Sequence, residues 1–242
     1  MCDENSEKFK NLFDMAKISY NDYIRTTEER HKNVVQNYWN DLNRQNLINS
    51  GKYEGYYSVS DESFIPLKDL IHEKETNNYK TILNQPVEYI TETSYLLNFK
   101  NYIDKYLSKL NNNELTFIPT YIKNEVNEYI NSELHVLSIS RPKSRVSWGI
   151  EVPNDKSQVI YVWFEALINY LTVLKSYLKT NNMSNNDNEV EYFHIIGKDI
   201  SKFHCYIWPL ILLMNNNNSK INIIMHSHWL MNSVRINFKS KG

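Results

Sequence analysis

Glycine is scarce in this sequence, and this bears on which classes of nucleotide-binding protein it can belong to. Only 5 of the 242 residues are glycine. Neither the Gly-rich loop of P-loop nucleotide hydrolases nor the Gly-rich turn of dinucleotide-binding dehydrogenases is present. The sequence therefore argues against both of these nucleotide-binding classes.

Cysteines and long apolar runs are also few. The two cysteines, Cys2 and Cys205, lie far apart and match no metal-binding spacing. Nothing suggests a disulfide framework, so a reducing, intracellular compartment fits, and Cys205 is expected to be a buried thiol. No run of 18 apolar residues occurs, so we expect no membrane-spanning segment.

Charge is nearly balanced overall but uneven along the chain. The formal net charge is -1, so no global field draws the protein to nucleic acid. After Asp199 there is no acidic residue, whereas five basic residues follow, namely Lys202, Lys220, Arg235, Lys239 and Lys241. This stretch could meet phosphate, although solvated lysine is the simpler interpretation.

Apolar and aromatic residues are present in ordinary globular proportions. The chain is 41% hydrophobic and contains 18 Tyr and 5 Trp, enough to build a core and to line a pocket. Apolar spacing predicts a helix over residues 4–17, an extended stretch over 18–24, and a second helix over 30–48 that ends at Gly51. The signal that starts the second helix is Thr26-Thr27-Glu28-Glu29.

The middle of the chain carries weaker patterns. Aromatic residues over 53–66 predict a hairpin, with Gly55 and Asp61 as turn candidates. Residues 68–85 are polar and are expected to form a loop or short strands. Between residues 92 and 131 we expect two helical segments, centred on Tyr102 and Val126 and separated at Pro119.

The last hundred residues predict an α/β fold. Strands are expected at 159–162, 192–196 and 221–225, with helices at 164–178 and 199–214 between them. This order is typical of a parallel sheet covered by helices, and such sheets bind ligands beyond the C-terminal ends of their strands. The prediction places six residues around one mouth, namely Trp163, Gly197, Lys198, Asp199, His226 and His228.

Several segments together carry a family resemblance. Residues 160–170, residues 194–200 with Phe203-His204 and Trp208-Pro209, and residues 226–230 stand in the order found in methionyl-tRNA synthetases. Four upstream segments fall in the same order: Ile24-Arg25-Thr26-Thr27, Tyr53-Glu54-Gly55-Tyr56-Tyr57, Pro86-Val87-Glu88-Tyr89, and Ser138-Ile139-Ser140-Arg141 followed by Trp148-Gly149-Ile150. The chain thus resembles this family nearly from end to end, and most of all its mitochondrial, zinc-free type.

The resemblance implies a fold and a domain organisation. It implies the second half of the parallel sheet of a class I synthetase, in a Rossmann-like catalytic domain with an inserted zinc-free connective subdomain. Residues 1–50 would end the first nucleotide-fold half and add linking helices, 51–90 would form the insert, and 91–242 would form the second half, stopping before the anticodon-binding domain.

The resemblance also implies a methionine pocket. Its residues would be Trp163, Ala166, Tyr170, Ile200, Phe203, His204 and Trp208. A thioether is soft and apolar and favours aromatic walls, which suits this set. Tyr170 and His204 would stand near the sulfur. The alternative from spacing alone is that these aromatics are ordinary core residues.

The remaining site residues concern ATP and the reaction centre. The resemblance implies that Gly197, Lys198, Asp199, His226, His228 and Trp229 border ATP, with Asp199 on the ribose. Asp199 could instead simply cap a helix. Arg141 and Lys239 would be the catalytic residues. The alternative for Arg141 is an exposed side chain that pairs with Glu151.

Three departures from the family are apparent. The early His-Ile-Gly-His segment is absent, and either Lys239-Ser240 or Arg235-Ile236 could match part of the Lys-Met-Ser-Lys-Ser loop, but neither alignment restores it. The hairpin carries Ser58 and Asp61 where zinc-bearing members have cysteines. Zinc needs soft ligands, so we expect no zinc and no other protein-held metal.

The resemblance implies an ATP-dependent methionine–tRNA ligase of mitochondrial translation. Its partners would be methionine, ATP with Mg²⁺, and the methionine tRNA, and it would act as a monomer in the mitochondrial matrix without a membrane. Because the two ATP segments are missing, we expect this chain to be truncated and inactive alone. Two alternatives stay open: a non-catalytic descendant that binds methionine, a nucleotide or a protein, and an α/β nucleotide-binding protein of another class.

Overall fold

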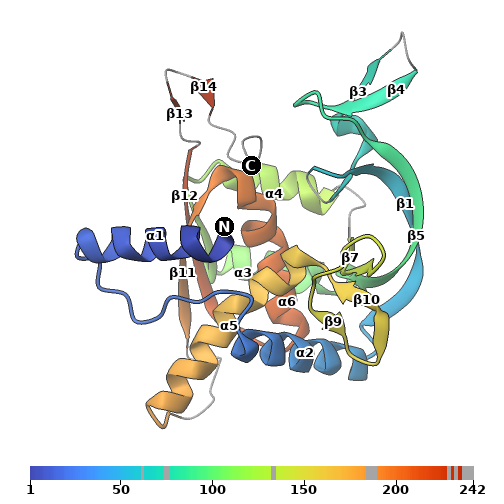
Figure 1. The fold of residues 1–242 in the computed structure, drawn as a ribbon. Helices are drawn as coiled ribbons and strands as arrows, with labels where there is room; N and C mark the ends of the chain where they lie inside the picture. The colour runs from blue at the N-terminus through green and yellow to red at the C-terminus, as the bar shows by residue number, and fades with distance from the viewer. Residues whose placement is uncertain are drawn as a thin grey trace.

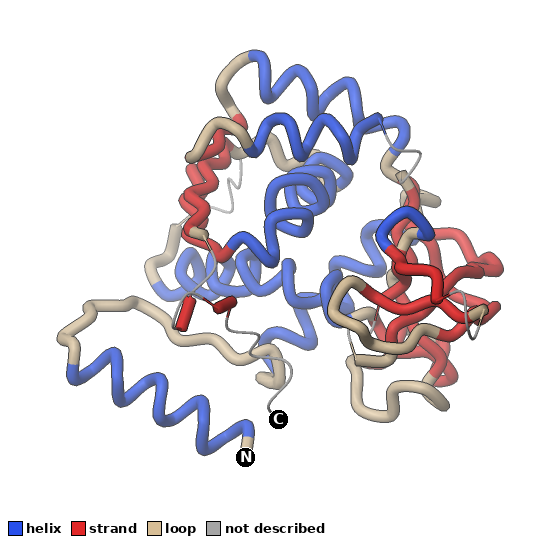
Figure 2. The backbone as a smooth tube through the Cα atoms, turned by 90° about the horizontal axis from the view of Figure 1, so that it is seen from above, coloured by secondary structure: helices blue, strands red, loops and turns tan. Residues whose placement is uncertain are grey.

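The structure is a computed structural model that describes residues 1–60, 63–73, 77–131, 135–183, 190–227, 230–231 and 234–235. Helices surround a small parallel sheet at one side of the molecule, and a curved antiparallel sheet stands at the other (Figure 1). Viewed from above, the two groups of strands lie apart with helices between them (Figure 2). No helix in the described residues combines the length and apolarity that crossing a bilayer requires.

The parallel sheet is built from three strands in the order β11-β12-β6. They are β11 (Glu191–Gly197), β12 (Lys220–His226) and β6 (Leu115–Ile118). Side chains alternate between two faces along each strand. The inner face includes Ile196, Ile223 and Phe117, all buried, whereas Phe193 and Ile195 on the outer face are 64% and 76% exposed.

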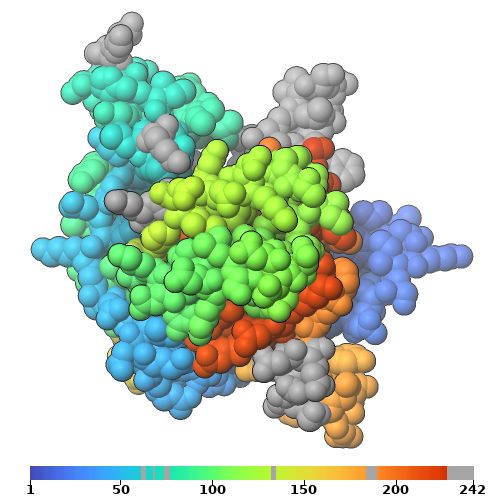
Figure 3. All heavy atoms as spheres, turned by 180° about the vertical axis from the view of Figure 1, so that it is seen from behind, coloured from blue at the N-terminus to red at the C-terminus, as the bar shows by residue number. Residues whose placement is uncertain are grey.

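Helices cover the inner face of this sheet and form the core with it. They are α2 (Glu29–Arg44), α3 (Ile103–Asn111), α4 (Ile122–Asn131), α5 (Val162–Thr180) and α6 (Trp208–Met214). Short helical turns precede two of them, namely η2 (Lys100–Tyr102) before α3, and η4 (Lys198–Ile200) with η5 (Lys202–Ile207) before α6. Every residue of α6 is buried. From behind, α3 and α4 occupy the middle of the surface (Figure 3).

The antiparallel part contains a four-stranded sheet in the order β2-β1-β5-β7. Its strands are β1 (Ile48–Ser58), β2 (Ser63–Ile65), β5 (Glu88–Asn98) and β7 (Val136–Ser138). After η1 (Leu67–Asp69), strands β3 (Leu70–Glu73) and β4 (Asn78–Thr81) pair as a separate arm. This sheet spans both sides of the domain boundary predicted at residue 90, a boundary that stays a prediction.

Another small sheet joins the two parts. Strands β8 (Ser140–Pro142), β9 (Glu151–Val152) and β10 (Asp155–Ile160) are antiparallel, in the order β8-β10-β9. β10 leads through Tyr161 into α5, as the sequence predicted. The predicted place of this strand in the parallel sheet is wrong, because β10 pairs with β8 and β9 while β6 supplies the third parallel strand.

Two further elements, near the ends of the chain, belong to none of these sheets or covering helices. Helix α1 (Cys2–Met15) confirms the first predicted helix, but none of its residues is buried, and it projects at one side (Figure 3). Near the other end, β13 (Leu230–Met231) pairs with β14 (Val234–Arg235).

Two glycine predictions are wrong. Helix α2 ends at Arg44, not at Gly51, because Asn46 takes up the left-handed conformation (φ 56°) that turns the chain out of the helix. Gly51 and Gly55 both lie inside β1, opposite Ser94 and Ile90 of β5. The turn between β1 and β2 therefore falls after Ser58, and Asp61 lies outside the described residues.

The prediction for residues 92–131 is correct for the helices alone. α3 follows Tyr102, and α4 contains Val126 beyond Pro119. However, β5 continues to Asn98 and β6 lies between the two helices. Both strands are fixed by partners distant in sequence, which local periodicity does not reveal.

Candidate functional site

Four of the six residues predicted for ATP, Gly197, Lys198, Asp199 and His226, lie at the ends of two parallel strands. Gly197 pairs with His226 where β11 and β12 end. A Cβ atom on Gly197 would lie 2.7 Å from Asp199 Oδ1 and 3.5 Å from His226 Cε1, so a larger residue here would displace the Asp199 carboxylate. His226 is exposed and its Nδ1 lies 2.8 Å from the carbonyl oxygen of Ser227.

Lys198 and Asp199 follow this strand end. Lys198 Nζ lies 3.3 Å from Glu125 Oε1 and 5.5 Å from the centre of the Tyr121 ring. Asp199 is exposed. The interpretation of Asp199 as a helix cap is wrong, because no side-chain capping hydrogen bond is made at the start of η4 or η5. Its carboxylate is open to a ligand at the edge of the sheet.

An aromatic cluster lies next to this strand end. The rings of Trp163, at the start of α5, and Phe203, in η5, stack with their centres 4.0 Å apart and their planes 8° from parallel. The Tyr170 ring lies 5.3 Å from Trp208 and 5.8 Å from His204. Five residues of the predicted methionine pocket are half-buried and two are buried: Trp163, Ala166, Tyr170, Ile200 and Phe203, then His204 and Trp208.

Helix geometry explains how these side chains meet. Trp163, Ala166 and Tyr170 are spaced by three and four residues, so they share one face of α5. The segment η5 is a π-helix, whose turns are wider than those of an α-helix. The structure places Trp163 against Phe203, and Tyr170 against His204 and Trp208, while Ala166 lies on α5 and Ile200 in η4. That these seven residues form a methionine pocket stays a prediction.

Hydrogen bonds fix the proton positions within the cluster. His204 Nδ1 lies 3.1 Å from the Ile200 carbonyl oxygen, which can only accept, so Nδ1 donates. Tyr170 Oη lies 2.6 Å from His204 Nε2, and the phenol donates to this nitrogen. The Trp208 indole donates to His194 Nε2 over 3.0 Å. The two histidines are therefore neutral here.

Burial keeps these groups uncharged. It lowers the pKa of His194 to about 4, with a smaller contribution from the neighbouring His204. Burial also lowers the pKa of His204 and raises the pKa of Tyr170 to about 12. At neutral pH the cluster is an apolar wall with neutral polar tips. His194 was not predicted as a site residue, although its alternation with Ile196 on β11 indicates an inward side chain.

A second cluster centres on Arg141. The interpretation of Arg141 as an exposed partner of Glu151 is wrong, because Arg141 is only 4% exposed and Glu151 pairs with Lys143. Arg141 Nη1 donates to Ser138 Oγ at 2.8 Å and to the Ser140 carbonyl oxygen at 2.7 Å. Its guanidinium carbon lies 4.0 Å from the centre of the Tyr161 ring.

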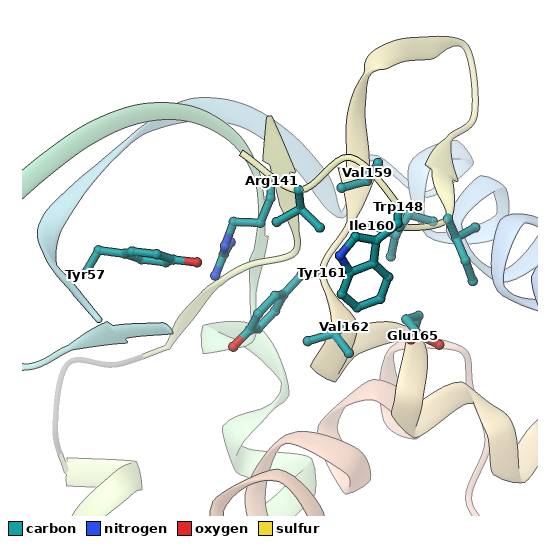
Figure 4. Close-up of a pocket in the computed structure, with 11 residues that line it drawn as sticks. Tyr57, Arg141, Trp148, Val159, Ile160, Tyr161, Val162 and Glu165 are labelled. Atoms are coloured by element: carbon teal, nitrogen blue, oxygen red, sulfur yellow. The ribbon is translucent and has the colours of Figure 1, made fainter. Parts of the chain in front are cut away.

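Arg141 borders a small cavity with a volume of about 30 Å³ (Figure 4). Tyr161, Val162 and Trp148 line the cavity from β10, the start of α5 and the turn before β9, and Tyr57 lines it from the curved sheet. Because Tyr161 stands two residues before Trp163, the arginine cluster and the aromatic cluster meet at the start of α5.

Glu165 lies at the other end of this cavity and belongs to a buried triad. His31 is 0% exposed, and its Nε2 lies 2.8 Å from Glu165 Oε2 while its Nδ1 lies 3.0 Å from Thr172 Oγ1. These contacts join α2 to α5. Sequence reasoning missed His31, since its partners are more than a hundred residues away.

Some predicted site residues fall outside the described part of the chain. These are His228, Trp229 and Lys239. Within the described residues, no group of three or more His, Cys, Asp or Glu side chains has the arrangement of a metal site. At the hairpin, Ser58 is fully buried and its hydroxyl lies 3.1 Å from that of Ser60.

Comparison with known proteins agrees with this geometry. Residues 1–75 and 69–242 match the family described as "tRNA synthetases class I (M)". A probable mitochondrial methionine–tRNA ligase of Dictyostelium discoideum is 38% identical over 100% of this chain and 43% of its own length. The mitochondrial methionine–tRNA ligase of Homo sapiens is 37% identical over 95% of this chain and 39% of its own length.

A solved structure extends the likeness to three dimensions. The crystal structure of Mycobacterium tuberculosis methionyl-tRNA synthetase bound by methionyl-adenylate superposes with a TM-score of 0.82 at 29% identity, covering 96% of this chain and 45% of that one. The chain thus spans less than half the length of these relatives. The family model and the relatives cover the whole chain and show its family: the chain belongs to the class I tRNA synthetases of the methionine (M) group.

Proposed function

We propose that this chain is the part of a methionine–tRNA ligase that selects methionine and holds one side of ATP. The observation that carries this proposal is the pocket in which Trp163 and Phe203 stack beside the neutral Tyr170–His204 pair. An apolar site with an uncharged polar tip suits a thioether, which is polarisable and accepts hydrogen bonds only weakly.

In this proposal the methionine side chain lies among seven residues. Trp163, Phe203 and Trp208 supply aromatic walls, Ala166 and Ile200 leave room between them, and Tyr170 and His204 face the sulfur. In this proposal methionine enters where Trp163 and Phe203 stack, and its binding would separate these two rings. The stacked pair would then close the pocket when methionine is absent.

ATP would bind across the ends of β11 and β12. The open carboxylate of Asp199 would accept hydrogen bonds from the ribose hydroxyls, with Gly197 allowing close approach of the nucleotide. Lys198, His226, His228 and Trp229 would border the same nucleotide. The methionine carboxylate attacks the α-phosphorus of ATP and pyrophosphate leaves, which gives methionyl-adenylate. A tRNA hydroxyl then attacks the carbonyl carbon and AMP leaves.

Arg141 and Lys239 are the proposed catalytic residues. Negative charge grows on the phosphate oxygens during attack, and a prepositioned cation stabilises it. Arg141 is suited to this role because it is held by Ser138, Ser140 and Tyr161 at the edge of a cavity. Mg²⁺ would accompany ATP and share this task. A hydroxyl at Ser58 is a poor zinc ligand, so we propose that the insert holds no zinc.

The wider context is also proposed from the relatives. The enzyme would charge the methionine tRNA of mitochondria, in the matrix, as a monomer and without a membrane. The first nucleotide-fold half would end within residues 1–50. The connective insert would be residues 51–90, and the second half would be residues 91–242.

Binding of methionine to the purified chain tests the proposal. Because Trp163 and Trp208 lie in the pocket, methionine should change the tryptophan fluorescence in a saturable manner. Leucine, which has a branched hydrocarbon side chain and no sulfur, should bind at least about tenfold more weakly. Equal responses to both amino acids, or no response to either, would refute methionine selection and favour a non-catalytic or different nucleotide-binding role.

A further inference from the structure

A buried carboxylate, Glu92, lies beneath the arginine cluster. Glu92 is in the middle of β5, and its side chain is 5% exposed. Its Oε2 lies 3.3 Å from Arg145 Nε and its Oε1 lies 4.0 Å from Arg141 Nε. Neither oxygen makes a hydrogen bond, and neither does Arg141 Nε. Burying such a group costs free energy, so its presence needs a reason.

Other contacts fix the rest of Arg141. Nη1 is occupied by Ser138 and Ser140, and the plane of the guanidinium lies over Tyr161. Among the described residues, Nη2 has no hydrogen-bond acceptor, and the guanidinium borders the cavity (Figure 4). Among the described residues, the guanidinium is thus held through Nη1 and the Tyr161 ring, and the charge of Glu92 acts on it from the side of Nε.

We propose that Glu92 is a positioning residue for Arg141, and that its charge holds the guanidinium against Tyr161 with Nη2 free for the phosphate of the substrate. This inference rests on the function proposed above. Glu92 attracts Arg141 without consuming its donors, because the two groups lie too far apart for a hydrogen bond. A bidentate carboxylate would have occupied the N–H groups that the substrate needs.

Charge balance in the cluster supports this role. Two arginines face one carboxylate, so one positive charge is left over next to the cavity, which suits an anionic substrate group. Burial raises the pKa of Glu92, and the two arginines oppose that rise. Tyr57 of β1 links the curved sheet to both arginines. Its ring centre lies 5.0 Å from the Arg145 guanidinium and 6.0 Å from that of Arg141. The curved sheet would thereby help to set the geometry at the reaction centre.

Measuring the binding of two ligands distinguishes a loss of Arg141 positioning from general damage to the fold. Calorimetry would measure how the chain binds methionine and methionyl sulfamoyl adenosine, a stable analogue of methionyl-adenylate. Glu92→Gln keeps the shape and removes the charge, so it should weaken binding of the analogue about tenfold and change methionine binding by less than about twofold. Glu88→Gln is the matched control, an exposed glutamate on the same strand, and should alter neither.

A double variant tests whether Glu92 acts through Arg141. If it does, Arg141→Gln with Glu92→Gln should bind the analogue no more weakly than Arg141→Gln alone. Additive losses would overturn the inference, and so would an equal loss for methionine and the analogue in Glu92→Gln.

Nuclear magnetic resonance gives a measurement that needs no ligand. The Arg141 Nε–H resonance should shift in Glu92→Gln and stay unchanged in Glu88→Gln. If the wild-type chain bound neither ligand, the proposed function would fail, and this resonance would still decide whether Glu92 sets Arg141. An unchanged Nε–H resonance in a folded Glu92→Gln chain would refute positioning whatever the binding results.

Discussion

The aromatic cluster and the arginine cluster adjoin one another at Tyr161 and Trp163. Their buried polar groups differ in charge and in hydrogen bonding. In the aromatic cluster, neutral side chains are joined by hydrogen bonds, from Tyr170 to His204 over 2.6 Å and from Trp208 to His194 over 3.0 Å. In the arginine cluster, both oxygens of Glu92 and one nitrogen of Arg141 make no hydrogen bond.

This difference matches what each region is proposed to bind. A neutral side chain is recognised by its shape. A rigid wall whose polar groups make hydrogen bonds can provide that shape at a low cost in free energy. A transferring phosphate needs charge, and charged donors that are already fully paired cannot respond to it. Incomplete pairing of buried groups is thus the feature that distinguishes the arginine cluster from the aromatic one. The following predictions test the contrast.

Loss of Trp208 should have the largest effect on stability. Trp208 is 0% exposed, so Trp208→Ala should lower the free energy of unfolding by about 3–5 kcal/mol in urea denaturation. The same change at Trp148, which is 70% exposed, should cost less than about 0.5 kcal/mol. Similar losses at the two positions would contradict the packing described for α6.

Acid should destabilise the pocket through His194. Its folded-state pKa is about 4, against an ordinary value of 6.5, so the unfolded chain binds the proton more strongly between these values. The free energy of unfolding therefore has its full value above pH 6.5, and it decreases as the pH falls toward 4. At pH 4.5 the loss should be about 2–3 kcal/mol.

His194→Gln should reduce this pH dependence, because glutamine does not titrate and its carbonyl oxygen can still accept from Trp208. The measurement is urea denaturation at pH 7 and pH 4.5. His204 shifts in the same direction and will leave part of the slope in place. Identical slopes for the two proteins would show that His194 does not charge on unfolding.

Removing one hydroxyl should have a smaller effect. Tyr170→Phe leaves His204 Nε2 without its donor in a buried site, which should cost about 1–2 kcal/mol. Tyr177→Phe on the same helix is the control, since Tyr177 is 50% exposed and should tolerate the change. Thermal or urea unfolding measures the stabilities of the two variants. Equal stabilities would imply that water replaces the Tyr170 hydroxyl.

The smallest effect is expected at Arg145. This side chain is 32% exposed and its ion pair with Glu92 spans 3.3 Å without hydrogen-bond alignment. Arg145→Gln should therefore change the free energy of unfolding by less than about 1 kcal/mol. A much larger loss in urea denaturation would show that Arg145, not Arg141, is the principal partner of Glu92.

The sequence predicted those parts of the fold in which local pattern and tertiary role agree. The leucine spacing in α5 and the apolar run of β12 both face the core, so their periodicity was visible. β5 was missed because its inward residues include Glu92 and Ser94, which give no apolar alternation. Its strand conformation comes from pairing with β1 over ten residue pairs, Ile48↔Leu97 to Tyr57↔Glu88.

The candidate site divides in the same way. The aromatic residues come from two short segments, 163–170 and 200–208, and the family resemblance identified them. Glu92 and His31 could not be predicted, because their importance depends on partners such as Arg141 and Glu165 that only the fold brings near. Long-range contacts of single polar residues leave no periodic trace in a sequence.

The π-helix of η5 sets a limit on how this segment can change in length. Each residue in an α-helix turns the chain by about 100°. Deleting one residue between Lys202 and Ile207 would convert the wide turn into an α-helix and rotate Phe203 and His204 relative to Trp208. Phe203 would then leave Trp163, and His204 would leave Tyr170. A single-codon deletion in this turn would therefore move several side chains of the aromatic cluster at once, whereas a substitution changes only one.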